Sequence, residues 1–155
     1  MIQTKANFLQ NNLFFAEVKK LLQDQKSVRI RVRGSSMLPF IRHNDAALLV
    51  PPTSRKIRKG SVVIALTDEL GYVMHRICKI EGEHITLLGD GNTNQYEHSD
   101  LDRIIAVAVR YDRGRFSYST ESWFMRIVGL LWMKMHPWRK NLVSVLWRVK
   151  TKLFK

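Results

Sequence analysis

The chain has 155 residues, of which 45% are hydrophobic and 25% charged, so it has enough apolar side chains to bury a core. Its 26 Lys and Arg residues outnumber its 13 Asp and Glu residues, which gives a formal net charge of +13. A single cysteine, Cys78, excludes an internal disulfide and a cysteine-based zinc site. No apolar run reaches the roughly 18 residues of a membrane-spanning helix, and the N-terminus lacks a secretory cleavage site. We therefore expect a cytoplasmic protein.

The positive charge is concentrated at the C-terminal end. Residues 1–121 hold 18 basic and 13 acidic residues, a net charge of +5. Residues 122–155 hold eight basic residues, no acidic residue and all four tryptophans. We therefore expect three parts: an N-terminal helix (1–26), a folded body (27–121) and a basic, Trp-rich tail (122–155).

Apolar residues recur every three or four positions over residues 7–24, which predicts a helix. Strict alternation of Val or Ile with Arg predicts a half-buried strand over residues 28–33, with a basic outer face. Short apolar runs bounded by turn residues predict further strands at 45–50, 61–66, 72–80, 84–88, 103–111 and 115–119. The tail predicts amphipathic helices over about 124–135 and 142–149, separated at Pro137. The expected fold is mainly β and antiparallel, with one helix before the body and a basic helical tail after it.

The turn after the first strand is the first candidate for chemistry, and it reads Gly34-Ser35-Ser36-Met37-Leu38-Pro39. A serine at the end of a strand can present its hydroxyl on the turn, while Met37 packs beneath it. Such a serine becomes a nucleophile only where a base takes its proton. The candidate base is His75, which interrupts the apolar run from Val73 to Ile77. The ordinary pKa of histidine, about 6.5, suits this work near neutral pH.

A third group often orients the histidine of such a pair. The turn Gly89-Asp90-Gly91-Asn92 offers Asp90 as the first candidate, and Glu97 is the second. Simpler interpretations stay open, because Asp is an ordinary residue of Gly- and Asn-rich turns and a lone His in an apolar strand can be part of the core.

Five sequence boxes occur in order over residues 27–110: G-x-S-M-x-P, N-D-x-x-L-L-V, K-G-S-V-V, H-R-I and G-D-G-N. This arrangement resembles the superfamily of signal peptidases and LexA-type serine peptidases. Bacterial signal peptidases and LexA-type proteins pair their serine with a lysine, whereas this sequence has His75 at the matching position. In this respect the chain is similar to the endoplasmic-reticulum-type signal peptidases, which use serine and histidine.

The resemblance implies a serine endopeptidase that cleaves a precursor or leader peptide through an acyl-enzyme. Carried over by position, Ser36 is the nucleophile, His75 the general base and Asp90 the group that orients it. Ser35 and Met37 belong to the turn that holds the oxyanion and the substrate. The resemblance implies neither a metal nor an organic cofactor.

Other functions compete with this reading. A non-catalytic basic module could bind a peptide, nucleic acid or an anionic membrane surface, although no nucleic-acid motif is visible and no specific nucleic acid is expected. A LexA-type self-cleaving regulator is disfavoured, because only about 27 residues precede the first strand and the cleaved dipeptides Ala-Gly and Cys-Gly do not occur. The tail, residues 122–155, could lie peripherally on an anionic membrane or pack on the body.

Overall fold

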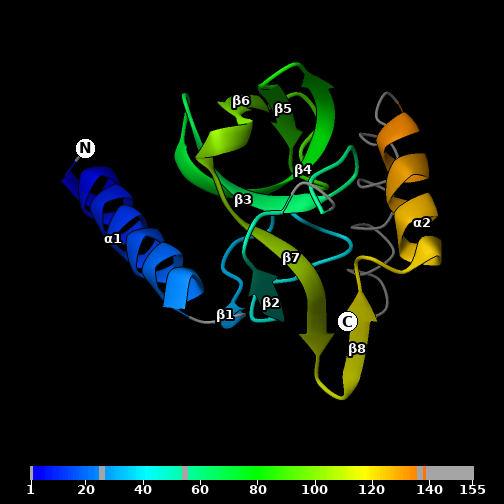
Figure 1. Ribbon diagram of the computed structural model, residues 1–155, viewed down its shortest axis with the longest axis horizontal. Helices are drawn as coiled ribbons and strands as arrows, with labels where there is room; N and C mark the ends of the chain where they lie inside the picture. Colours follow the sequence, from blue (N-terminus) through cyan, green and yellow to red (C-terminus); the bar gives the residue numbers. More distant parts are fainter. Residues whose placement is uncertain (1, 25–26, 54–55, 136–137, 139–155) are drawn as a thin grey trace, which may run out of the picture.

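The computed structural model describes residues 2–24, 27–53, 56–135 and 138, and in this part of the chain it has one antiparallel sheet between two helices. Figure 1 shows the helices on opposite sides of the sheet. The elements are α1 (Ile2–Asp24), β1 (Val28–Arg31), β2 (Ala46–Val50), β3 (Val62–Thr67), β4 (Gly71–Glu81), β5 (His84–Leu88), β6 (Tyr96–Asp100), a 3₁₀ turn η1 (Leu101–Arg103), β7 (Ile104–Arg113), β8 (Phe116–Ser119) and α2 (Trp123–Lys134). The expected fold class, mainly β with a helix at each end, is confirmed.

The sheet runs in the order β1-β2-β7-β3-β4-β5-β6, with β8 added beside β7. Both of its faces are covered. In β3, Val62 and Ile64 join one apolar cluster, whereas Val63 and Ala65 join the other. This division follows from the two-residue period of a strand. Strands β3 to β6 roll up at one end of the molecule, so that β6 approaches β3 again (Figure 1).

Helix α1 covers one side of the sheet. It buries Phe15, Val18 and Leu22, whose spacing of three and four residues places them on one face. The Asn11 side-chain amide donates to the Tyr72 carbonyl oxygen at 3.2 Å. The predicted helix over 7–24 is confirmed, and it begins earlier than predicted, at Ile2.

Helix α2 begins where Ser122 caps it, with the Ser122 hydroxyl accepting from the Met125 N–H at 3.3 Å. Its inner face packs on the sheet body, and Gly129 is buried there. The first predicted tail helix is thus confirmed, while Pro137 and the second predicted helix lie outside the described residues. In the described ranges, neither helix combines the length and the apolar content that crossing a bilayer requires.

Strand β6 is absent from the sequence-based prediction. Its sequence, Tyr-Glu-His-Ser-Asp, contains no aliphatic residue, and its inward side chains are polar: Glu97 and Ser99 are buried. A half-buried strand is recognised in a sequence by alternating apolar and polar residues. In β6 the buried and the exposed residues are all polar or aromatic, so this signal is missing. The same strand carries a candidate site residue.

Candidate active site

The predicted nucleophile lies on a tight turn directly after β1. Gly34 has a φ of +100°, a left-handed conformation that favours glycine, and it turns the chain out of the strand. The Leu38 N–H then donates to the Ser35 carbonyl oxygen at 3.1 Å, and the Ile41 N–H donates to that of Met37 at 2.9 Å. Met37 is buried beneath the turn, as predicted, whereas Ser36 is half-buried and Ser35 exposed.

A second turn, residues 89–92, holds this serine turn in place. The Gly91 N–H donates to the Ser36 carbonyl oxygen at 2.7 Å. A Cβ atom on Gly89 would lie 2.6 Å from the same oxygen, which is closer than such contacts allow, so this position requires glycine. The turn begins directly after β5, and Leu88 of β5 pairs with Arg76 of β4. The backbone of Ser36 is therefore anchored beside the strand that carries His75.

His75 forms a buried pair with Glu97. Its Nδ1 lies 2.8 Å from Glu97 Oε2, and the side chains are 5% and 0% exposed. The strand register explains why these two side chains meet. His75 lies opposite Val63, and Glu97 lies opposite Leu87. Val63 and Leu87 belong to the same buried cluster. The pair thus lies on one face of the rolled sheet.

The second Glu97 oxygen, Oε1, is buried and makes no hydrogen bond with any described residue. Glu97 therefore directs its one polar contact at His75. When Nδ1 donates to this carboxylate, the opposite ring nitrogen, Nε2, carries the lone pair and can accept a proton.

The prediction that Asp90 orients His75 is corrected by this geometry. Both Asp90 oxygens bind the Arg76 guanidinium instead, at 2.8 Å from Nε and 2.7 Å from Nη2. Successive side chains of a strand point to opposite faces, so Arg76 and its partner lie on the face away from His75. Glu97, the second of the two candidates, is the residue that the structure places at the histidine.

The Arg76–Asp90 pair joins several parts of the molecule. Arg76 Nη1 donates to the Gly60 carbonyl oxygen at 2.7 Å, and the guanidinium lies over the Phe40 ring, 5.5 Å from its centre. Trp132 of α2 donates from its indole N–H to the Asp90 carbonyl oxygen at 2.8 Å. Burial by itself lowers the pKa of Arg76, but the charge and hydrogen bonds of Asp90 outweigh it and raise the pKa above its ordinary value. Arg76 is therefore charged inside the protein.

Replacing Asp90 by asparagine is expected to lower the free energy of unfolding by about 3–5 kcal/mol, the usual cost of leaving one partner of a buried ion pair uncompensated. The pair is 8% and 1% exposed, so solvent cannot replace the lost carboxylate. Urea unfolding monitored by circular dichroism measures the change.

The matched control is Glu81→Gln, which removes the partner of Lys79 in an ion pair whose side chains are 60% and 63% exposed. Its expected effect is under about 1 kcal/mol. Equal unfolding midpoints for Asp90→Asn and Glu81→Gln would contradict the structural role of Asp90.

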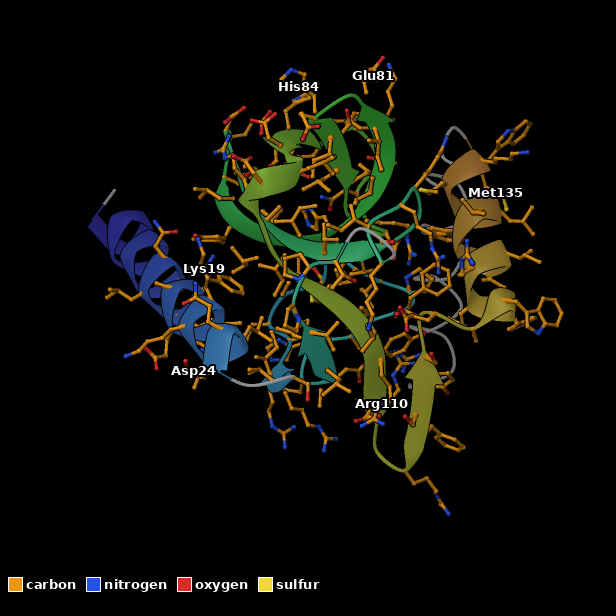
Figure 2. All side chains as sticks on the ribbon, in the orientation of Figure 1. Lys19, Asp24, Glu81, His84, Arg110 and Met135 are labelled. Carbon is orange, nitrogen blue, oxygen red and sulfur yellow. The ribbon has the colours of Figure 1, made fainter. Side chains whose placement is uncertain are left out.

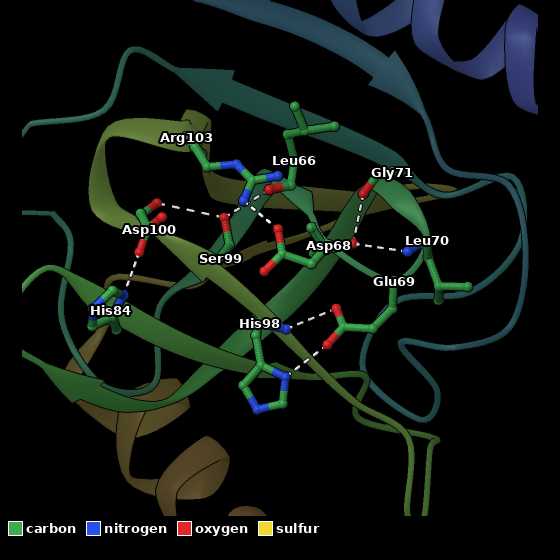
Figure 3. A network of polar contacts seen from close by, with 11 residues as sticks. Leu66, Asp68, Glu69, Leu70, Gly71, His84, His98, Ser99, Asp100 and Arg103 are labelled. Carbon is green, nitrogen blue, oxygen red and sulfur yellow. Dashed lines mark hydrogen bonds and ion pairs between the residues drawn. The ribbon is translucent and has the colours of Figure 1, made fainter.

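A network of polar contacts links β6 to the turn between β3 and β4 (Figure 3). Ser99 donates from its hydroxyl to the Leu66 carbonyl oxygen at 2.7 Å. Glu69 accepts from both the backbone N–H of His98, at 3.0 Å, and its ring Nδ1, at 2.7 Å. Arg103 forms an ion pair with Asp68. These contacts close the roll of strands at the point where β6 approaches the end of β3.

Among the described residues, Ser36 and His75 form no hydrogen bond with each other. Hydrogen bonds between a nucleophile and its base are often long without substrate and shorten when substrate binds. The arrangement can supply a serine hydroxyl on an anchored turn and a histidine held in one tautomer by a buried carboxylate.

In a comparison with protein families, the model of the family described as Peptidase S24-like matches residues 5–109. The chain belongs to the Peptidase S24-like family. The match includes the serine turn, His75, Asp90 and Glu97. Neither a search of curated proteins nor a search of solved structures found a match. The resemblance to LexA-type and signal-peptidase-type serine peptidases is thus confirmed at the level of the superfamily.

Sequence reasoning about this S24-like chain missed Arg76 altogether. The signal was present: a charged residue stands directly after His75, in a run of residues that otherwise reads as core. A buried arginine requires an acid as its partner. If one of the two candidate acids, Asp90 and Glu97, pairs with Arg76, only the other remains for His75.

Proposed function

We propose that this S24-like protein is a serine endopeptidase that cleaves a precursor or leader peptide through an acyl-enzyme. The observation that carries the proposal is the buried contact between His75 Nδ1 and Glu97 Oε2, 2.8 Å long. A buried acid that contacts a histidine beside an anchored serine turn is the arrangement expected of a general base.

In the proposed reaction, the Ser36 hydroxyl oxygen attacks the scissile carbonyl carbon while His75 Nε2 takes the hydroxyl proton. His75 then gives this proton to the leaving amine, and the peptide bond breaks. A water molecule then attacks the resulting ester and gives a proton to His75. The ester bond to Ser36 breaks, the new carboxyl end leaves, and His75 returns the proton to the Ser36 oxygen. Glu97 remains a carboxylate throughout and stabilises the imidazolium that forms between these steps.

The developing oxyanion needs donors that are already in place. Backbone N–H groups of the Ser36 turn are the proposed donors, with the Ser35 hydroxyl beside them. Strand β1 stands at one end of the sheet order and leads into this turn. An extended substrate can therefore add to the sheet there by strand pairing.

The test compares the N-termini of peptides in the source cell, with wild-type protein and with Ser36→Ala at equal expression. His75→Ala serves as the second inactive variant. We expect N-termini that occur only with the wild-type protein, and their sequences identify the substrate and the cleavage motif. Identical profiles, with all three proteins folded and present, would overturn the proposal.

A non-catalytic basic binding module is the second candidate. It is favoured by the net charge of +13 and by the exposed apolar side chains of α2. Under this alternative, ligand binding is unchanged in Ser36→Ala and no new N-termini arise. A self-cleaving regulator, the third candidate, would instead shorten its own chain, which mass spectrometry of the intact protein detects.

A further inference from the structure

The outer face of α2 carries large apolar side chains over its whole length. Six such side chains, on the helix and just past its end at Lys134, are 40–74% exposed: Trp123, Phe124, Ile127, Leu131, Met135 and Trp138. Four of the six, Phe124, Ile127, Leu131 and Met135, are three or four positions apart and therefore share one side of the helix. Figure 2 shows side chains projecting from α2 away from the sheet. An apolar set of this size is uncommon on a surface helix and marks a site of interaction. We call these six residues the α2 outer face.

The opposite side of the same helix is firmly packed. A Cβ atom on Gly129 would lie 2.8 Å from Arg76 Nη1, so the helix approaches the sheet very closely here. Trp132 donates to the Asp90 carbonyl oxygen, and Met125 packs against the core. These contacts fix the rotation of α2 about its axis. The packing of the inner side therefore holds the α2 outer face toward the solvent.

Basic residues surround this helix. The loop before β3 meets α2 at a small cavity, whose lining includes Lys56, Arg58, Lys59, Glu121, Arg126 and Leu130. Four of these six residues are basic and one is acidic. Lys134 is exposed in the last turn of α2, and the first turn has no acidic residue. The apolar face is thus bordered by positive charge.

We propose that the α2 outer face docks on an anionic membrane surface. Basic residues beside an apolar helical face attract anionic headgroups, and the apolar side chains enter the boundary between headgroups and acyl chains. Trp123 and Trp138 stand at the two ends of the set, and tryptophan favours this interfacial depth. Helix α2 has 12 residues, whereas a spanning helix needs about 20, so it lies along the surface.

This proposal is independent of the peptidase chemistry. A protein partner would also accept an apolar face, but the excess of basic over acidic residues around α2 favours a surface of uniform negative charge. Since the inner face of α2 binds the 89–92 turn, docking also sets how the Ser36 turn is oriented toward the membrane.

The test measures sedimentation of the full chain with vesicles of phosphatidylglycerol and phosphatidylcholine in equal parts, and with vesicles of phosphatidylcholine alone. We expect binding to the anionic vesicles that weakens as salt rises. Ile127→Asp with Leu131→Asp is expected to weaken it about 100-fold, roughly tenfold for each apolar side chain that no longer enters the membrane. Lys59→Gln and Lys134→Gln are each expected to weaken it about fivefold.

The matched control is Leu13→Asp, because Leu13 is 72% exposed on α1, on the far side of the sheet (Figure 1). Its binding is expected to equal that of the wild type. Urea midpoints show whether the two aspartates unfold the protein. If they do, Trp123→Gln with Phe124→Gln repeats the test at other exposed positions.

Three results would overturn the proposal. The first is vesicle binding that is absent in the wild type or unchanged by both double substitutions. The second is a wild-type protein that binds no vesicles but self-associates, and whose self-association is abolished by Ile127→Asp with Leu131→Asp. A second copy of the chain would then cover the α2 outer face. The third is tight binding of a short RNA that depends on the same side chains, again without vesicle binding.

Discussion

Replacing Ser36 by alanine is expected to lower kcat for the identified peptide by about 10⁶-fold, and replacing His75 by alanine is expected to cost nearly as much. The two groups act as a unit, because the histidine has no proton to take without the hydroxyl, and the hydroxyl is a weak nucleophile without the histidine. Replacing both should therefore add little to either single loss. Single-turnover assays of the three variants, with the cleaved peptide as substrate, measure this.

Ser36→Ala should fold like the wild type, whereas His75→Ala removes the partner of the buried Glu97 carboxylate and is expected to lower the urea midpoint. Ser36 is half-buried, and its backbone carbonyl, which alanine retains, accepts the hydrogen bond from Gly91. Loss of activity with an unchanged urea midpoint is thus a loss of chemistry. If the two losses multiplied in the double variant, Ser36 and His75 would act independently, and the proposed mechanism would be wrong.

Replacing Glu97 by glutamine is expected to lower kcat by about 10³–10⁴-fold with little change in KM. Glutamine has the same shape, but its amide can donate to His75 Nδ1, which leaves the proton on Nε2 and the wrong tautomer facing the serine. It also removes the negative charge that stabilises the imidazolium. Urea midpoints of Glu97→Gln and the wild type, measured beside kcat, separate a loss of chemistry from a loss of fold.

The matched control is Glu69→Gln, which alters a second contact between an acid and a histidine on the same molecule. Glu69 lies 2.7 Å from His98, but the two side chains are 39% and 60% exposed and lie at the β3–β4 turn. Its expected effect on kcat is less than about twofold, as for a surface ion pair. Similar losses in both variants would show that Glu97 acts on the fold and not on the histidine.

The sequence by itself determined the local features of this protein. Apolar periodicity placed α1 and α2, and alternation bounded by turn residues placed seven of the eight described strands within a few residues. The turn that carries Ser36 and the strand that carries His75 were also found in this way. Each of these features depends on a few neighbouring residues, so a local pattern is sufficient to reveal it.

Only the tertiary structure decided which acid meets the histidine. Asp90 and Glu97 both follow β5 closely in the chain, and nothing in their neighbours separates them. The decision depends on which face of β4 each side chain reaches, and that depends on strand register and on the roll that brings β6 back toward β3. Arg76 points to one face and takes Asp90, so Glu97, on the other, remains for His75.

The same reason applies to β6 and to α2. Strand β6 has polar inward side chains because they meet a histidine and a backbone carbonyl of other strands, and a pattern based on hydrophobicity cannot register such partners. The sequence predicted an amphipathic helix at α2, but it did not show which side packs on the body. Gly129 decided this, because the absence of a side chain there lets the helix approach Arg76 and turns the α2 outer face to the solvent.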